Sequence, residues 1–281
     1  MLAALGDLIE DVVVRLAGPI RHAGDTEANV SRRRGGSAAN VCAAAASLGH
    51  PTRLIAQVGD DHIGRSLVDG LERSGVDTEA IGFAGDTGTI IVLVDELGER
   101  TMLTDRRSAL SLGPHDPRWL DGVDTLHVPF YSLTLGRLAE TARATIADAR
   151  RLGIAVSIDV SSVTELDRLG IAGARAVLTE LAPTVIFANA DEAAALAIDG
   201  PVGGSLTVVK RGPRSAIVHR PDGTTSDVPA LEVAGAVDTT GAGDAFAAGF
   251  LTAVDRSSDP DAACAAGHAA AAAVLRSRAI C

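Results

Sequence analysis

The segment AVDTTGAGDAFAAGFLTAV, residues 236–254, joins a strand-like entry to an apolar helix through a Gly-rich turn. A strand that passes through a turn into a helix is the repeating unit of an α/β fold. The first backbone amides of a helix have no intrahelical partner, and the helix dipole favours negative charge beside them. Gly241, Ala242 and Gly243 carry little or no side chain, so a phosphoryl group can approach these amides closely. The turn is therefore predicted to bind an anion.

Asp244 lies in the first turn of the same predicted helix and has two interpretations. A carboxylate at this position can serve only as an N-terminal cap, which the helix dipole stabilises. However, a carboxylate beside a phosphate repels it, so the residue makes more sense as the acceptor of a proton from a hydroxyl that attacks phosphorus. The loop alone leaves both interpretations open.

Other phosphate-binding and hydrolytic motifs are absent from the sequence. No GxxxxGK followed by Ser or Thr occurs, so the loop is not a Walker A motif. A dinucleotide GxGxxG would need its third Gly at Phe246 and an early position in the chain. HExxH, a zinc-type Cys cluster and GxSxG are also missing, which excludes metalloproteases and serine hydrolases of those types.

Composition narrows the class of protein and its partners. Of 281 residues 47% are apolar but only 2% aromatic, so the core must consist of Ala, Val, Leu and Ile, as in helices packed on a parallel sheet. The formal charge of −11 argues against nucleic acids and anionic membranes as partners. The start MLAALGDLIED lacks a signal peptide's basic region, and no apolar run reaches about 18 residues. Three cysteines without a CxxC pair fit a reducing cytoplasm, where we expect the protein.

Short apolar strands alternate with helical segments along most of the chain, which predicts a doubly wound α/β fold. The segment GDLIED, residues 6–11, is expected to interrupt two N-terminal strands and to place its acidic residues at a sheet edge or in a turn. The predicted strands are residues 1–5, 12–16, 53–58, 89–94, 126–128, 155–159, 185–188 and 205–209. The clearest helices are 35–49, which two glycines open, 61–75 and 135–153.

Two segments depart from this alternation, at about residues 12–34 and 80–107, where the pattern is strand-like and partly polar. We interpret them as insertions that form a small accessory sheet. No linker rich in Pro, Gly or Ser divides the chain and no repeat is present, so residues 1–281 are predicted to form a single domain.

Two long signatures make the sequence resemble the ribokinase or PfkB family of carbohydrate kinases. The first is GGSAANVCAAAASLG, residues 35–49, followed by QVGDDHIGRSLVDGLERSGVDT, and the second is DTTGAGDAFAAGFL, residues 238–251. The resemblance implies a ribokinase-like doubly wound sheet, mostly parallel, flanked by helices and covered by a β-sheet lid. It also implies ATP- and Mg²⁺-dependent phosphorylation of a sugar or sugar-like substrate, with a primary hydroxyl as the expected acceptor. Asp244 then corresponds to the catalytic base, and Gly241, Ala242 and Gly243 to the anion hole.

The resemblance also assigns residues to the substrate. Asp11 corresponds to a ligand of substrate hydroxyls, with a turn-forming Asp as the alternative. Gly36 and Asn40 correspond to further contacts, although Asn40 can also be an ordinary residue of a helix start. Arg106 stands where members that act on acidic sugars place an Arg against a carboxylate, with an exposed surface Arg as the alternative. Ribose-specific members have a Glu where this chain reads VPFYSL, residues 128–133, so Phe130 and Tyr131 either line a larger pocket or form a buried pair.

A second group of residues corresponds to the nucleotide and its metal. Asn189 and Glu192 match the element that positions Mg²⁺ and the phosphates through water, although the local pattern alone favours a helix cap. Lys210, the only Lys in the chain, is a candidate ATP neighbour. His268 corresponds to a position near the nucleotide, with a structural helix His as the alternative. The full set of expected ATP contacts is Asn189, Glu192, Lys210, Gly212, Gly243 and His268.

Asp238 and Thr240 match the part of the signature that binds a monovalent cation such as K⁺ in many members. The terminal RSRAIC lacks the Gly of the loop that completes that cation site, which argues against activation by K⁺. The resemblance further implies a homodimer through the lid. Two rival functions stay open: a nucleoside or vitamin kinase of the same fold, and a ligand-binding regulator without catalysis.

Overall fold

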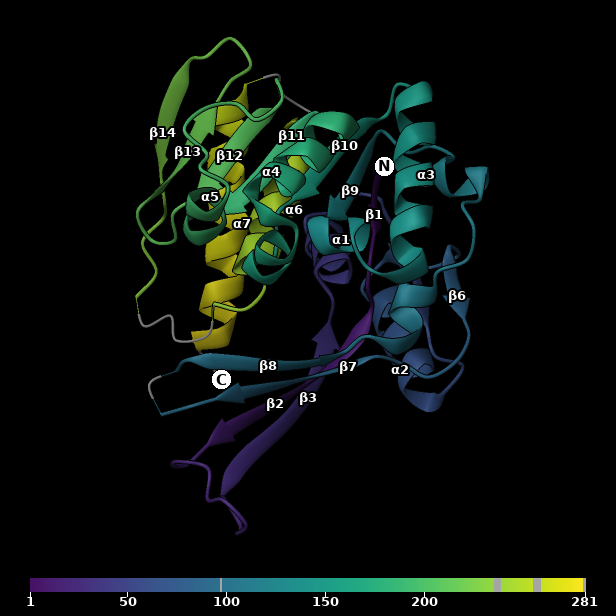
Figure 1. Ribbon diagram of the computed structural model, residues 1–281, viewed down its shortest axis with the longest axis vertical. Coiled ribbons are helices and arrows are strands. Elements are labelled where there is room, and N and C mark those ends of the chain that lie inside the picture. Colours follow the sequence, from purple (N-terminus) through teal and green to yellow (C-terminus); the bar gives the residue numbers. More distant parts are fainter. Residues whose placement is uncertain (97, 235–238, 255–258, 280–281) are drawn as a thin grey trace.

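The computed structural model describes residues 1–96, 98–234, 239–254 and 259–279, and these contain one large sheet and one small sheet. Neighbouring strands of the large sheet from β12 to β5 run parallel, and β13 and β14 extend it in the antiparallel direction (Figure 1). Its order is β14 (Thr225–Pro229), β13 (Ser215–His219), β12 (Leu206–Lys210), β11 (Val185–Asn189), β10 (Ala155–Asp159), β9 (Thr125–Pro129), β1 (Leu2–Leu5), β4 (Thr52–Val58) and β5 (Val76–Asp77), with β6 (Ile81–Phe83) also paired to β4.

Helices cover both faces of the large sheet, which confirms the predicted doubly wound class. Strands such as β11, with the sequence VIFAN, are apolar along most of their length because both of their faces are buried. One face packs against α3 (Gly136–Arg151), α4 (Val163–Leu181) and α5 (Ala190–Ala195). The other face packs against α1 (Ser37–Ser47), α2 (His62–Arg73), α6 (Ala242–Val254) and α7 (Pro260–Ala279).

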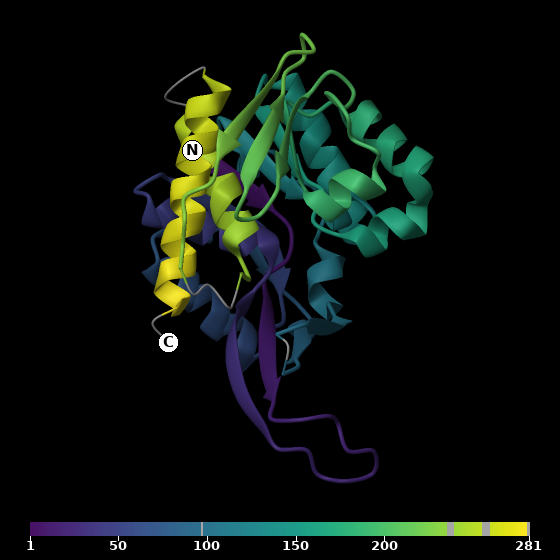
Figure 2. The same ribbon diagram turned by 90° about the vertical axis from the view of Figure 1, so that its left-hand side faces the viewer.

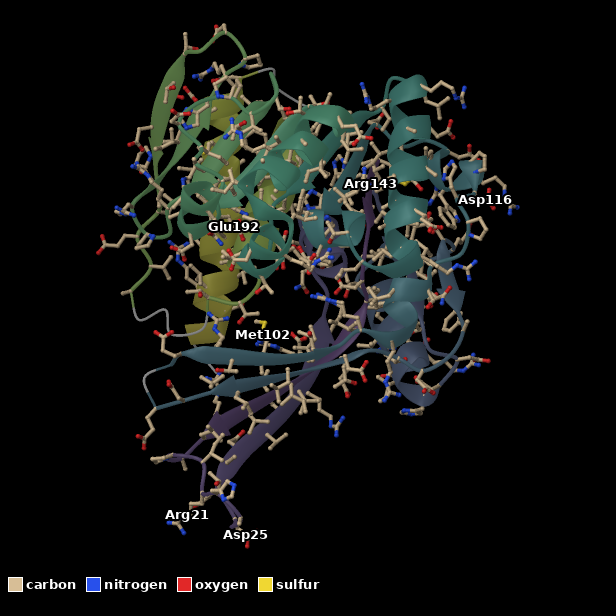
Figure 3. The ribbon with its side chains drawn as sticks, viewed as in Figure 1. Arg21, Asp25, Met102, Asp116, Arg143 and Glu192 are labelled. Carbon is tan, nitrogen blue, oxygen red and sulfur yellow. The ribbon has the colours of Figure 1, made fainter. Side chains whose placement is uncertain are left out.

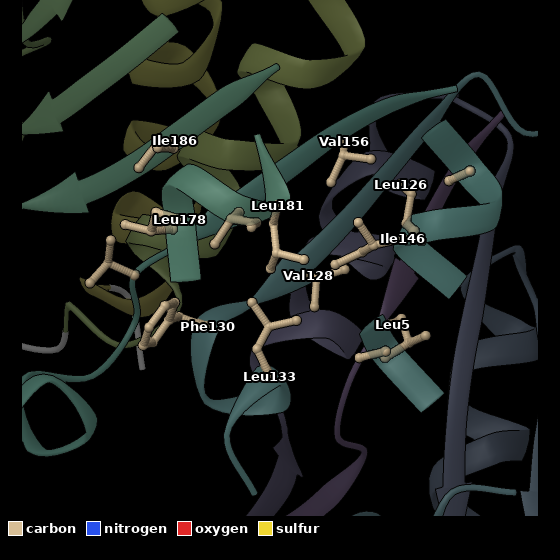
Figure 4. Close-up of a cluster of buried hydrophobic side chains, with 14 of the residues drawn as sticks. Leu5, Leu126, Val128, Phe130, Leu133, Ile146, Val156, Leu178, Leu181 and Ile186 are labelled. Atoms are coloured by element: carbon tan, nitrogen blue, oxygen red, sulfur yellow. The ribbon is translucent and has the colours of Figure 1, made fainter. Parts of the chain in front are cut away.

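The core is built mainly from aliphatic side chains, as the low aromatic content requires. Leu126 and Val128 from β9 and Ile146 from α3 belong to one buried cluster between the sheet and the α3–α5 layer (Figure 4). On the opposite face Phe187 meets Phe250 edge to face, with ring centroids 5.2 Å apart. These two layers hold the carboxyl ends of the parallel strands in fixed positions.

The small sheet forms a lid that projects from the body (Figures 1 and 2). Its order is β3 (Ala28–Gly35), β2 (Ile9–Leu16), β7 (Thr89–Val94) and β8 (Arg100–Asp105). Val13 and Val92 stand opposite each other on one lid face and are buried, whereas Ile91 and Leu103 share the other face and are exposed. Met102, on the first of these faces, points toward the body (Figure 3).

Two expectations about this region need correction. The acidic segment 6–11 does not separate the first two strands as a whole, because residues 9–11 already belong to β2. Asp11 therefore lies within a strand and not in a turn. In addition, residues 81–83 pair with β4 of the main sheet, so the second lid insertion contributes strands only from Thr89 onward.

Cys42 and Cys264 are buried free thiols, whereas Cys281 lies outside the described residues. Burial raises the pKa of each of these two thiols to about 12, so both remain protonated at neutral pH. None of the helices in the described ranges combines the length and the apolar composition needed to cross a bilayer.

Candidate active site

The carboxylate of Asp244 lies where two helices begin. Asp244 is the third residue of α6, and Gly241 forms the preceding turn with a φ of 76°, which favours glycine. Ser37 Oγ donates a hydrogen bond to Asp244 Oδ1 at 2.7 Å, and Asn40 Nδ2 donates to Oδ2 at 2.9 Å. Both donors belong to the first turn of α1. The start of α1 thus holds the carboxylate beside the predicted anion-binding turn.

The surroundings of Asp244 change its acidity. Burial raises the pKa of its carboxyl group to about 6, although the hydrogen bonds from Ser37 and Asn40 act in the opposite direction. The negative charge of Asp159 raises the pKa further, and the positive charge of Lys210 lowers it. A carboxylate with a pKa near 6 is still ionised at neutral pH and is a better proton acceptor than an ordinary Asp.

The carboxyl ends of neighbouring parallel strands bring charged residues together next to this turn. Asp159 ends β10, Asn189 ends β11 and Lys210 ends β12. Lys210 Nζ lies 2.6 Å from Asp159 Oδ2, and both side chains are largely buried. A Cβ atom added to Gly243 would lie only 3.4 Å from Lys210 Nζ, so the ammonium group stands against the predicted anion hole.

Glu192 (labelled in Figure 3) is buried, and the charges of Asp159 and Lys210 act on its carboxyl group. Asn189 Oδ1 accepts from the Glu192 amide at 2.9 Å, while Glu192 Oε2 accepts from the Asn189 amide at 2.8 Å. The two residues therefore form the capping box of α5, which is the local alternative that the sequence left open. Burial, followed by the charge of Asp159, raises the pKa of Glu192 to about 7. A capping role does not exclude a contact with a water-bound metal.

A cavity of about 490 Å³ opens beside the turn. It brings together four of the residues predicted to contact ATP, namely Lys210, Gly212, Gly243 and His268. Its other walls are mostly apolar and include Leu231, Phe246 and Leu275. An apolar pocket that ends at an anion-binding turn and a Lys suits a base with attached phosphates.

His268 makes the contacts of a structural helix residue and also lines the cavity, and its contact with the nucleotide stays a prediction. Its Nε2 atom lies 3.1 Å from the carbonyl oxygen of Val228, so this nitrogen carries the proton and donates. Burial lowers the pKa of His268, which keeps the ring neutral. The ring packs edge to face on Phe246 and also lines the cavity.

The predicted substrate residues come from the lid and from the start of α1. Asp11, on β2, is partly buried, and its Oδ2 atom lies 3.7 Å from Arg33 Nε. Its carboxylate lies directly against Gly35, because a Cβ added there would stand 2.1 Å from Asp11 Oδ1 and would displace the carboxylate. Asn40 is engaged with Asp244, which is a role that the sequence did not predict.

The backbone itself favours glycine at position 36, which is a different reason for Gly36 from a close approach of the substrate. Its φ is 100°, and an added Cβ would lie 2.2 Å from the carbonyl oxygen of Asp7. We expect Gly36→Ala to lower the free energy of unfolding by roughly 3 kcal/mol or more, since strain and a backbone clash combine.

The control for this change is Gly49→Ala at the other end of α1. Gly49 has a φ of 74° but nothing lies within 4 Å of an added Cβ. The free energy of unfolding of Gly49→Ala should fall by only about 1–2 kcal/mol, because a side chain is disfavoured in the left-handed backbone region. Equal losses in urea denaturation of the two variants would contradict the clash.

Arg106 follows β8 and connects the lid with the body. Its Nη1 atom donates to Asp7 Oδ2 at 2.6 Å, and the Tyr131 hydroxyl donates to Asp7 Oδ1. The guanidinium carbon lies 4.5 Å from the centre of the Tyr131 ring. Arg106 is thus partly buried and held by two partners, and its contact with substrate stays a prediction. Phe130 is fully buried in the core, as in the buried-pair alternative.

Another Arg connects the lid with the signature loop. Arg100 Nη2 donates to Thr239 Oγ1 at 2.7 Å, and Nη1 donates to Thr240 Oγ1. Asp238, predicted with Thr240 as a monovalent cation ligand, lies outside the described residues. The lid is therefore closed over the start of the predicted anion hole.

Sequence reasoning missed three residues of this site: Ser37, Asp159 and Asp7. Ser37 had a usable signal, because it stands three residues before Asn40 and so shares its helix face. Asp159 also had one, as the polar end of a predicted strand. Nothing local distinguished Asp7 from its acidic neighbours.

The chain is similar to known carbohydrate kinases. The model of the pfkB family carbohydrate kinases matches residues 1–280. The chain is 38% identical over 240 residues to an ATP-dependent ribose-1-phosphate kinase of Halopiger xanaduensis, which covers 81% of this chain and 76% of the relative. It is 31% identical over 274 residues to a fructokinase of Klebsiella pneumoniae, covering 92% and 85%.

A solved structure supports the fold. A putative ribokinase II from E. coli, in complex with ATP and Mg²⁺, superimposes with a TM-score of 0.81 over 96% of this chain and 91% of the other. The two sequences are 20% identical.

Proposed function

Because the chain belongs to the pfkB family of carbohydrate kinases, we propose that it transfers the terminal phosphoryl group of ATP to a primary hydroxyl of a sugar or sugar-like substrate, with Asp244 as general base. The observation that carries this proposal is the placement of the Asp244 carboxylate. It follows Gly241–Gly243 directly and is held by Ser37 and Asn40 at the start of α1. A base adjacent to an anion hole is the arrangement that phosphoryl transfer to a hydroxyl needs.

Binding of the two reactants follows from the walls of the site. The apolar cavity beside Phe246 and His268 is proposed to take the base of ATP, and Lys210 to contact its phosphates. The amides at Gly241, Ala242 and Gly243 are proposed to stabilise charge on the transferring group. Asp11, Gly36, Asn40 and Arg106 are proposed to face the sugar, beneath the lid that keeps water away.

The residues at the strand ends suit Mg²⁺. Asp159 and Glu192 are buried carboxylates, and carboxylate oxygens are ligands that Mg²⁺ accepts, often through retained water. We propose that Glu192, together with Asn189, holds the ion indirectly. When bound with ATP, the ion would neutralise negative charge on the phosphates.

Asp244 supplies the proton acceptor. The attacking hydroxyl donates to the carboxylate, its oxygen forms the new bond to phosphorus, and the bond from phosphorus to the bridging oxygen of ADP breaks. The proton released by the hydroxyl goes to Asp244. Lys210 and the backbone amides offset the charge that shifts to ADP.

If Asp244 is the general base, its protonation determines how kcat/KM depends on pH. The base must be ionised, so protonation below the pKa of Asp244, about 6, should remove activity. We expect kcat/KM to fall about tenfold for each pH unit well below pH 6, and to become level above about pH 7. The measurement is sugar-dependent ADP release from pH 4 to 8, and an acid limb centred near pH 4 would contradict the raised pKa of the base.

A panel of substrates tests the function itself. Ribose 1-phosphate and fructose are the first members, since the named relatives act on them, followed by other sugars, sugar acids and nucleosides. We expect ADP release that depends on a sugar or sugar derivative. ATP consumption at the background rate with every compound would instead favour a non-catalytic regulator.

A monovalent cation is a separate question. Thr240 was expected to help bind it, yet the Thr240 hydroxyl accepts from the guanidinium of Arg100. Positive charge at this position opposes a second cation. We therefore propose a kinase whose rate is equal with K⁺ and with tetramethylammonium.

The outward face of the lid supports the expected homodimer. Val30, Ile91 and Leu103 lie on this face and are exposed by 59%, 37% and 52%. Pairing of two such faces would bury apolar surface. ATP dependence and two buried free thiols support a cytoplasmic location.

A further inference from the structure

The Ser37 hydroxyl contacts the carboxylate to which a substrate hydroxyl would give its proton if Asp244 is the base. It donates to Asp244 Oδ1 at 2.7 Å, while Asn40 already donates to Oδ2 at 2.9 Å. Each oxygen of the proposed base thus has a protein donor before any sugar is present. Asn40 is an amide and cannot give up a proton in a reaction at this site. Ser37 is a hydroxyl of the same chemical type as the acceptor.

Ser37 is held there by the backbone. It is the first residue of α1, directly after Gly36, whose φ of 100° and close contact with Asp7 fix the start of the helix. Asn40 lies one turn further on the same helix face, so the two donors act as a pair. The hydroxyl therefore cannot leave Asp244 by a large backbone movement, and it can yield only by rotating its side chain.

A water molecule at the same place would lead a kinase to hydrolyse ATP. A hydroxyl and a water are similar in size, and a water bonded to Asp244 Oδ1 would be hydrogen-bonded to the base and next to the anion hole. Such a water would be an activated nucleophile that hydrolyses ATP. The lid, proposed above to keep bulk solvent away, would not by itself remove a single water beside the carboxylate.

We propose that Ser37 is a positioning residue that keeps water from the proton-accepting oxygen of Asp244 until a sugar hydroxyl replaces it. The residue thus sets the ratio of sugar phosphorylation to ATP hydrolysis. This inference rests on the proposed function of Asp244 as the general base. It assigns Ser37 a role in coupling that the helix start alone does not require.

The test compares Ser37→Ala with Ser37→Thr and with wild type. In Ser37→Ala the space of the hydroxyl becomes available to water, and we expect ATP hydrolysis without sugar to rise by about tenfold, a modest part of what a general base contributes. The acid limb of kcat/KM should also move to higher pH, because a donor to the ionised carboxylate is lost. Ser37→Thr retains the hydroxyl and should restore both properties.

Ser47→Ala is the matched control. Ser47 lies at the other end of α1, is exposed, and its hydroxyl donates to the carbonyl of Ala44. This variant should leave hydrolysis, the acid limb and sugar phosphorylation unchanged. This control distinguishes the effect of removing any hydroxyl from α1 from the effect of removing the contact with Asp244.

Two results would overturn the proposal. One is a Ser37→Ala enzyme that phosphorylates sugar but has wild-type hydrolysis and a wild-type acid limb. The other is a wild-type enzyme that gains the mass of one phosphoryl group at Ser37 when incubated with ATP alone, because Ser37 would then be an acceptor itself. Failure of the proposed function looks different, since wild type would release no ADP with any sugar.

Discussion

Replacing Asp244 by Asn should reduce turnover by roughly 10²–10⁴, the usual contribution of a general base, while ATP still binds. The amide has nearly the same shape but accepts no proton at neutral pH. Asn40 can rotate its amide to present the oxygen to the new donor, so the start of α1 can keep its position. The measurement is sugar-dependent ADP release, together with calorimetric titration of ATP into both proteins.

The stability of the same variant distinguishes the base from a simple helix cap. The pKa of Asp244 is raised in the folded protein to about 6, above its ordinary value of 3.8. Stability therefore falls as pH rises through this interval, and at neutral pH the ionised group is unfavourable in the fold. Asn carries no such charge, so the melting temperature should not fall. A pure cap predicts the reverse: lower stability and near-normal turnover.

Asp261→Asn provides the control for the dipole effect. Asp261 lies in the first turn of α7 and receives a hydrogen bond from Arg220 at 2.7 Å. This variant should lose at most about 1 kcal/mol of stability and keep full activity. Equal activity of the Asp244 and Asp261 variants would contradict the assignment of the base.

Lys210→Met should cause the second large effect, a loss of about 3–5 kcal/mol in the free energy of unfolding. The ammonium group lies 2.6 Å from Asp159, whose side chain is 7% exposed. Without it, Asp159 is left as a buried charge, and the charges of Glu192 and Asp244 also lose an attractive partner. ATP affinity should fall as well, because Lys210 lines the cavity beside the anion hole.

A double variant checks the cause of this loss. Lys210→Met combined with Asp159→Asn removes both members of the pair, so most of the stability should return. ATP affinity should not return, because the contact with the phosphates is still absent. Arg65→Met is the control, since Arg65 pairs with Asp60, both side chains are more than half exposed, and the variant should lose at most about 1 kcal/mol. Urea denaturation and calorimetry measure both quantities.

The fold and the centre of the site could be predicted because their signals are local. The turn at Gly241–Gly243 and the residue Asp244 are consecutive in the sequence, and the alternating strands follow from short apolar runs. The capping box of Asn189 and Glu192 is local too, and its pattern was visible. The resemblance to the family then indicated that the two signatures, residues 35–49 and 238–251, belong to one site.

The remaining features depend on long-range contacts that no local pattern encodes. Lys210 and Asp159 are 51 residues apart, and they meet because parallel neighbours end at one edge of the sheet. Arg106 and Asp7 are 99 residues apart and meet where the lid returns to the body. Asp11 was expected at a sheet edge or in a turn because GDLIED interrupts two apolar runs, but pairing of β2 with β3 and β7 extends the strand through it.

The central claim is that this protein moves a phosphoryl group from ATP to a sugar hydroxyl with the help of Asp244. The most direct measurement is phosphorus NMR of reactions that contain ATP, Mg²⁺ and the panel substrate with the fastest ADP release, for wild type and Asp244→Asn. We predict a new sugar phosphomonoester in an amount equal to the ADP formed by wild type, and almost none with the variant. ADP accompanied only by inorganic phosphate, or equal product from both proteins, would contradict the claim.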